Sequence, residues 1–275
     1  MRVASPHDPS RAIHFQIQGD GTPLLLGFPM MASHAETFGQ EGAAVLRGYL
    51  ERLTDRYRVL LVDYPSIGKS DTIPPGELTA DRVCADLLAV AASAGFDHFA
   101  YWGYSWGGGV GLQLASRTDR LSALVVGGWS PLGGHYAEAL AGARLQVANP
   151  PESAMVVLRS PGQYAQWISY LESIEGWPEA DAVARISCPR LVFFGANSLT
   201  DAGGIPIPIA ATIRSRKFEL ERLGWRLAEI PDRDFSVCLD PEAVVPAVRE
   251  FLDASPSPID AMRPASSRTA KGKGT

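Results

Sequence analysis

The sequence predicts an α/β fold in which a mostly parallel sheet is covered by helices. Short segments with the alternating or wholly apolar pattern of strands take turns along the chain with longer segments of helical periodicity. Hydrophobic residues make up 46% and charged residues 20% of the 275 residues, so the chain can bury a large core. Strand–helix alternation is typical of parallel sheets, because parallel neighbours need a crossover connection that is usually a helix.

The expected strands begin with residues 13–18, which alternate apolar and polar side chains, and 24–26, a wholly apolar run typical of a strand covered on both faces. The other expected strands are 57–63, 99–104, 121–126, 190–194 and 225–230. Helices are expected over 42–54 and 78–94, where apolar residues recur on one helical stripe, and over 107–116. Asp240 and Pro241 fit the N-cap and first turn of a last helix.

Residues 130–184 interrupt this alternation, since they indicate several short helices without a strand between them. We therefore expect an α/β core formed by 11–129 and 185–254, with 130–184 inserted as a helical lid. The tail 255–275 is rich in Ser, Pro, Ala and Gly, and we expect it to be disordered.

Charge and composition exclude several classes of function. The net charge is -5, with 25 Lys and Arg against 30 Asp and Glu, which disfavours a general nucleic-acid binder. No apolar run approaches the roughly 20 residues of a membrane span, and residues 1–11 lack the apolar stretch of a signal peptide. Cys84, Cys188 and Cys238 lie too far apart for a disulfide framework or a spaced metal site. We expect a cytoplasmic protein without a metal, cofactor, nucleic-acid partner or membrane partner.

The strongest motif is Gly103-Tyr104-Ser105-Trp106-Gly107, which matches Gly-x-Ser-x-Gly between an expected strand and an expected helix. Glycines are needed there because the backbone turns sharply and a Cβ would clash. The turn places the serine at a helix N-terminus, where the helix dipole favours a developing anion.

With this motif the chain resembles the α/β-hydrolase fold family over about residues 11–253. Three further segments support the resemblance, namely 26–29, 63–70 and 188–195. The resemblance implies that Ser105 is the nucleophile and that the backbone N–H groups of Phe28 and Trp106 hold an oxyanion. In the segment 63–70, Ser66 stands where the family has a glycine.

The sequence departs from the family at the proton relay. A serine needs an imidazole to take its proton and a carboxylate to orient that imidazole. The family places the histidine on the loop after the last strand, where this chain has Phe235, and no histidine follows His135. At the acid position the chain has Ser198. Asp201, three residues further on, could be the acid if the loop is longer, or it could be a residue that caps the loop. The expected triad is therefore degenerate.

A base could come from elsewhere in the chain. We consider His34, just after the oxyanion segment, and His135, at the start of the lid, as candidates; each could instead be a pocket wall. Asp234 is a third candidate if burial raises its pKa. The other histidines are expected far from the site; His14, for example, is expected in the first strand, away from the carboxyl edge of the sheet.

Apolar and aromatic residues gather near the same edge and predict a large apolar cavity. The residues expected to line this pocket, besides the oxyanion residues, are Met30, Met31, His34, Trp129 and His135. Such a cavity suits a small hydrophobic or modified-peptide substrate.

Three functions fit these observations. The first is non-hydrolytic proton transfer of the epimerase or isomerase type on a carbonyl substrate of secondary metabolism. In this respect the chain is similar to atypical hydrolase-fold proteins of peptide natural-product pathways, such as the bottromycin epimerase. The alternatives are a serine esterase or amidase that uses Ser105 with a relocated base (His34 or His135), and a ligand-binding pseudo-hydrolase.

Overall fold

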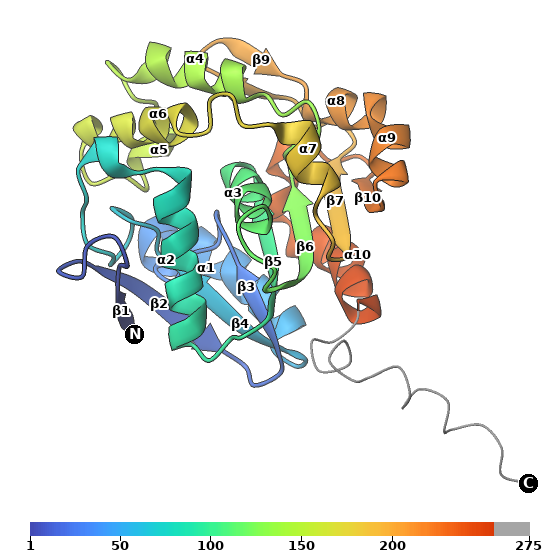
Figure 1. The fold of residues 1–275 in the computed structure, drawn as a ribbon, viewed down its shortest axis with the longest axis horizontal. Coiled ribbons are helices and arrows are strands. Elements are labelled where there is room, and N and C mark those ends of the chain that lie inside the picture. The colour runs from blue at the N-terminus through green and yellow to red at the C-terminus, as the bar shows by residue number, and fades with distance from the viewer. Residues whose placement is uncertain (256–275) are drawn as a thin grey trace, which may run out of the picture.

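The computed structural model describes residues 1–255, so the tail expected to be disordered lies, apart from Ser255, outside the described residues. Eight strands form the central sheet in the order β1-β2-β4-β3-β5-β6-β7-β10 (Figure 1). Their bounds are β1 (Arg2–Ala4), β2 (Ala12–Gln18), β3 (Thr22–Leu26), β4 (Tyr57–Val62), β5 (Phe99–Tyr104), β6 (Leu121–Gly127), β7 (Arg190–Gly195) and β10 (Trp225–Ile230). The pairs β1–β2 and β2–β4 are antiparallel and the others are parallel, which confirms the expected mostly parallel sheet.

Two pairs of helices cover the faces of this sheet. The helices α1 (His34–Leu53) and α10 (Pro241–Ala254) pack together on one face, and α2 (Ala80–Ser93) and α3 (Trp106–Ala115) pack together on the other (Figure 1). Successive side chains of a strand point to opposite faces. Leu25 of β3 therefore joins the core layer under α2 and α3, whereas Leu24 and Leu26 join the layer under α1 and α10.

The segment expected to form a lid contains only helical elements. They are α4 (Tyr136–Gln146), α5 (Glu152–Met155), η2 (Pro161–Tyr164), α6 (Ala165–Glu172) and α7 (Glu179–Ala184). Figure 1 shows α4, α5 and α6 beyond the edge of the sheet toward which the arrow of β6 points. This is the edge at which the parallel strands end, and therefore the edge that carries Ser105.

Several elements differ from the expectation. A hairpin of β8 (Thr200–Ala202) and β9 (Ile205–Ile207) follows β7, with Gly203 and Gly204 at φ 63° and 87° in its turn. The edge strand β1 was not expected, and α1 begins eight residues earlier than predicted, with a kink at Gly39. The remaining short helices are η1 (Pro75–Glu77), α8 (Ile209–Ser215), α9 (Lys217–Arg222) and η3 (Phe235–Leu239).

The expected position of His14 is wrong. Because β2 runs antiparallel to β4, its first residues lie beside the end of β4: Phe15 pairs with Val62. His14 therefore lies at the carboxyl edge of the parallel strands, where its Nδ1 is 2.9 Å from a carboxylate oxygen of Asp63.

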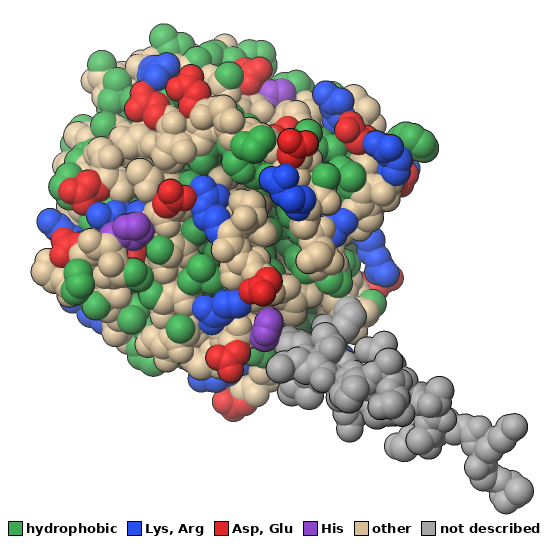
Figure 2. Space-filling view, viewed as in Figure 1, with side chains coloured by type: hydrophobic (Ala, Val, Ile, Leu, Met, Phe, Trp, Pro, Cys, Tyr) green, Lys and Arg blue, Asp and Glu red, His purple; other side chains and the backbone are tan. Residues whose placement is uncertain are grey.

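Acidic and basic side chains are interspersed on the face seen in Figure 2, without a large area of one sign. Within residues 1–255, no helix combines the length and the apolar character that crossing a membrane requires.

Candidate functional site

The turn between β5 and α3 has the geometry that the motif predicts. Ser105 has φ 54° and ψ -124°, a left-handed conformation that costs a non-glycine residue energy. A Cβ on Gly103 would lie 2.2 Å from the carbonyl oxygen of Gly107, and one on Gly107 would lie 2.1 Å from that of Phe28. Both glycines are therefore required by close backbone contacts.

The Ser105 side chain is available for chemistry. It is partly exposed and does not cap α3, although Ser105 occupies the N-cap position of that helix. The N–H of Trp106 begins the first turn of α3, where backbone donors have no partner within the helix. The hydroxyl and this donor therefore lie together at the positive end of the helix dipole.

We expect Ser105→Gly to stabilise the protein by about 1 kcal/mol while abolishing any chemistry of the hydroxyl. Relief of a strain of about 1–3 kcal/mol exceeds the roughly 0.4–1 kcal/mol by which glycine favours the unfolded chain. Urea denaturation measures the difference. Ser105→Ala is the control, because it removes the hydroxyl but keeps the strained backbone. Equal stability of the two variants would show that the turn is not strained.

A chain of hydrogen bonds through the core joins Phe28 to Gly107, the residue after Trp106. The Phe28 N–H donates to the Tyr64 hydroxyl (3.2 Å), the hydroxyls of Tyr64 and Tyr101 are 3.4 Å apart, and the Tyr101 hydroxyl donates to the Gly107 carbonyl (2.8 Å). Since Tyr101 has one hydrogen, which goes to Gly107, Tyr64 must donate to Tyr101 and accept from Phe28. Burial raises the pKa of Tyr64 to about 12, so its hydroxyl keeps this proton.

These hydrogen bonds change what can be expected of the oxyanion donors. The Phe28 N–H, which the resemblance assigns to the oxyanion, donates to Tyr64 in the core. The Trp106 N–H remains as the donor next to Ser105. Tyr64 was not anticipated from the sequence, because no local pattern shows that its hydroxyl meets a backbone group 36 residues away.

We call the turn between β5 and α3 that carries Ser105 the elbow. An apolar cavity of about 410 Å³ lies beside it. The core contributes Phe28, Pro29, Phe38 and Trp106, and the lid contributes Ser153, Ala154, Val157, Trp167 and Leu171. The prediction of an apolar cavity at this edge thus agrees with the structure, but most of its walls were not anticipated. The sequence gives only a weak indication of these wall residues. Five of the nine come from the short lid helices and a turn beside one of them, and local periodicity does not determine how these segments pack.

The residues expected to line the pocket lie elsewhere. Met30 and Met31 are buried in opposite core layers. Trp129 packs against Gly108 and donates from its indole to the Tyr136 hydroxyl at 3.3 Å. None of these residues, nor His34 or His135, lines the apolar cavity.

His34 nevertheless contacts two residues that line the cavity, Pro29 and Phe38. Its Nδ1 is 3.0 Å from the carbonyl oxygen of Pro29, and its ring packs on Phe38 with centroids 4.6 Å apart. A carbonyl only accepts, so Nδ1 carries the hydrogen and Nε2 of the neutral ring holds the lone pair. Burial lowers the pKa of His34, which favours this neutral form. Pro29 and Phe38 line the same cavity as Trp106, so His34 contacts the wall of the cavity that lies beside Trp106.

His135 is held by other groups. Its Nε2 is 2.9 Å from the Thr212 hydroxyl, which itself donates to the Pro208 carbonyl. Nε2 must therefore carry the hydrogen, while Nδ1 faces Glu138 at 3.7 Å. Both nitrogens of His135 point to the lid and α8, and no hydrogen bond among the described residues joins it to Ser105.

The residues at the acid position do not form a relay. Asp201 is exposed in the β8–β9 hairpin and accepts from the Gly204 N–H at 2.8 Å, as a turn residue does. Ser198 is buried on the loop after β7, where its N–H donates to the Gly195 carbonyl. Within residues 1–255 no carboxylate forms a hydrogen bond with a histidine other than His14.

Phe235, which the sequence resemblance puts at the histidine position, begins η3. Its carbonyl accepts from the Tyr104 hydroxyl at 2.7 Å, and the two rings are 5.4 Å apart. Asp232 has φ 55° and Ser66 has φ 66°, so both residues adopt a left-handed backbone conformation.

Asp234 does not have the raised pKa that a carboxylate base would need. It is exposed and accepts from the hydroxyl and the N–H of Ser236, and these hydrogen bonds lower its pKa. The hypothesis of Asp234 as a buried base is therefore wrong.

A buried carboxylate fixes the loop that precedes His34. Asp63 is fully buried after β4 and accepts from His14 Nδ1 (2.9 Å), from the N–H (2.8 Å) and hydroxyl (2.6 Å) of Ser33, and from the Lys69 N–H (2.9 Å). One carboxylate thus joins the start of α1, the loop 63–70 and the strand β2.

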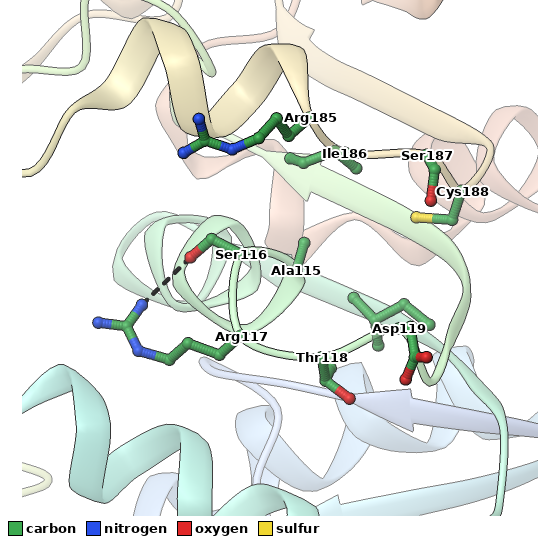
Figure 3. A pocket seen from close by; sticks show the side chains of 10 residues that line it. Ala115, Ser116, Arg117, Thr118, Asp119, Arg185, Ile186, Ser187 and Cys188 are labelled. Atoms are coloured by element: carbon green, nitrogen blue, oxygen red, sulfur yellow. Dashed lines mark hydrogen bonds between the residues drawn. The ribbon is translucent and has the colours of Figure 1, made fainter.

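A larger cavity of about 450 Å³ lies at the other end of α3, around Ser116 and Cys188 (Figure 3). With ten residues at 1.5 Å each, α3 separates it from Ser105 by roughly 15 Å. Figure 3 shows the guanidinium groups of Arg117 and Arg185 extending away from Cys188. Burial raises the pKa of the Cys188 thiol to about 11, so this thiol is not an activated nucleophile.

Comparison with known proteins agrees with the fold described above. A family model described as "alpha/beta hydrolase fold" matches residues 39–132. Among solved structures, a thermophilic esterase from Thermogutta terrifontis superposes with a TM-score of 0.65 at 22% identity, over 92% of this chain and 97% of that one. The chain has the α/β-hydrolase fold. At this identity the likeness shows the fold alone.

Curated relatives of this α/β-hydrolase-fold chain share one name. The "Putative carbamate hydrolase RutD" of Caulobacter segnis is 35% identical over 91 residues, which are 32% of this chain and 34% of that protein. The protein of the same name from Klebsiella pneumoniae is 26% identical over 231 residues, 72% of this chain and 86% of that protein. Three RutD relatives are matched over less than half of their length, 34%, 48% and 46%.

Proposed function

We propose that the protein is a serine hydrolase that cleaves an uncharged ester, amide or carbamate. Ser105 is the nucleophile and His34 is the general base. The observation that carries the proposal is the strained elbow, which presents the Ser105 hydroxyl and the Trp106 N–H at the N-terminus of α3 beside the apolar cavity. The names of the RutD relatives support hydrolysis over other chemistry.

In this mechanism the Ser105 hydroxyl attacks the substrate carbonyl and its proton passes to Nε2 of His34, directly or through one water. The Trp106 N–H and the dipole of α3 stabilise the developing oxyanion. The same proton then returns to the leaving group, and a water releases the acyl group from Ser105. The Pro29 carbonyl orients His34 in place of a carboxylate. A carbonyl stabilises an imidazolium less than a carboxylate does, so we expect slow turnover.

A fluorophosphonate probe tests this function. We expect a covalent adduct on Ser105, no adduct on Ser105→Ala, and an adduct that forms at least about tenfold more slowly on His34→Asn, because the hydroxyl then lacks its base. Mass spectrometry of the intact protein measures the adduct. A folded protein that does not react with the probe would contradict serine hydrolysis.

A second candidate is the non-hydrolytic proton transfer expected from the sequence. Two observations favour it: Phe235 at the histidine position and the Phe28 N–H donating to Tyr64. In that reaction His34 would remove a proton next to a carbonyl, and the Trp106 N–H would hold the enolate oxygen. Exchange of substrate hydrogen for deuterium without probe labelling would favour this candidate. Ligand stabilisation without exchange or hydrolysis would favour a binding protein.

A further inference from the structure

We propose that the cavity beside the elbow receives a bulky, uncharged aryl group of the substrate and excludes charged groups. The inference rests on the proposed function for the position of the scissile bond, and on the cavity itself for the chemistry of the group. It identifies the class of substrate: acyl compounds with an aromatic substituent a few bonds from the carbonyl.

The walls of the cavity determine its charge preference. Eight of the nine lining residues are apolar, the ninth is Ser153, and no lining residue is charged. An ion without a partner in such a space loses much of its solvation free energy and gains nothing in return. A small charged acyl group would therefore remain in water rather than enter.

The size of the cavity favours a ring. A cavity of about 150 Å³ lined by aliphatic and aromatic side chains binds benzene. The present cavity, at about 410 Å³, exceeds this volume and falls within the range of small-molecule sites. A methyl or ethyl group would leave most of it empty and make few contacts.

The geometry of the aromatic walls favours an aryl group over a linear alkyl chain. The Trp106 ring meets Phe28, Tyr64, Trp167 and Tyr170 edge to face, with centroids 5.0–5.5 Å apart. These contacts hold the wall in one orientation before a ligand arrives. An added ring continues the edge-to-face arrangement, which is favourable beyond the burial of apolar area alone.

Binding of two ketones tests the inference without chemistry. Benzylacetone and levulinate share a methyl ketone and a two-carbon spacer and differ in a phenyl group against a carboxylate. Their binding to Ser105→Ala is measured by tryptophan fluorescence, to which Trp106 and Trp167 in the walls contribute, and by thermal stabilisation. We expect benzylacetone to bind at least about tenfold more tightly, a difference of about 1.4 kcal/mol.

Filling the cavity should weaken this binding. Ala154→Trp in the Ser105→Ala background places a large ring among the lid residues of the wall, and we expect about a tenfold loss of benzylacetone affinity. Leu145→Trp is the matched control, since Leu145 is 65% exposed on the lid and lines no part of the cavity. If circular dichroism shows that Ala154→Trp is misfolded, Val157→Phe replaces it.

The outcomes separate this inference from the proposed function. Selective benzylacetone binding with no hydrolysis of nitrophenyl acetate by the unmodified chain would support the cavity assignment and contradict hydrolysis. Equal binding of levulinate, no binding of either ketone, or no effect of filling the cavity would overturn the assignment, whether or not Ser105 reacts with the probe.

Discussion

His34→Asn should lower kcat/KM for ester hydrolysis about 10²–10⁴-fold, the contribution expected of a positioned general base. The asparagine amide can still donate to the Pro29 carbonyl, as Nδ1 of His34 does at 3.0 Å, so the loop keeps its contact. What is lost is the lone pair on Nε2. Initial rates with nitrophenyl acetate measure the effect.

The pH dependence gives an independent test of the same residue. Burial lowers the pKa of His34 below its ordinary value of 6.5, so the basic form persists as the pH falls through that value. The acid limb of kcat/KM should therefore lie below pH 6.5. It should be absent from the residual activity of His34→Asn.

His135→Gln is the matched control for His34→Asn. The glutamine amide can replace Nε2 as a donor to Thr212, so the lid contact survives. We expect kcat/KM to stay within about twofold, since exposed or lid substitutions away from the reacting atoms have small effects. A large loss in this variant with an unchanged His34→Asn would move the base to His135.

Asp63→Asn should destabilise the protein by about 3–5 kcal/mol, the cost of removing one partner from a buried charged network. The carboxylate accepts four hydrogen bonds and is fully buried. The amide nitrogen of asparagine is a donor, so it would face N–H and O–H donors instead of accepting from them. Urea denaturation measures the loss.

Glu36→Gln is the control for Asp63→Asn. Glu36 pairs with Lys69 on the same loops, 2.6 Å away, but both side chains are about half exposed. An exposed pair contributes about 0–1 kcal/mol, so the control should change stability little. Similar losses in both variants would show that the buried carboxylate has no special role.

The sequence predicts those parts of the molecule that depend on local chemistry. The elbow at Ser105 follows from two glycines whose missing Cβ atoms admit the Gly107 and Phe28 carbonyls. The helix-only character of the lid follows from the loss of strand periodicity after β6. Ser66, which stands where the family has a glycine, also keeps a left-handed backbone.

Other features depend on contacts between distant segments, which no local pattern shows. The direction of β2 places His14 beside Asp63, although the alternation in β2 reads the same in both directions. The role of His34 depends on the Pro29 carbonyl and on Phe38, and that of Tyr64 on Phe28. Each of these requires the folded chain.

The position of the lid within the chain has a consequence in polymer terms. Residues 128–189 connect two parallel, paired strands, β6 and β7. Each doubling of such a connection raises the entropic cost of closing it by only about 0.6 kcal/mol, so growth from about 15 to about 60 residues costs roughly 1.2 kcal/mol. The lid supplies five of the nine cavity walls. Insertions and substitutions there can therefore change ligand selectivity while the free energy of the sheet changes little. Ligand selectivity and the stability of the sheet can thus diverge independently.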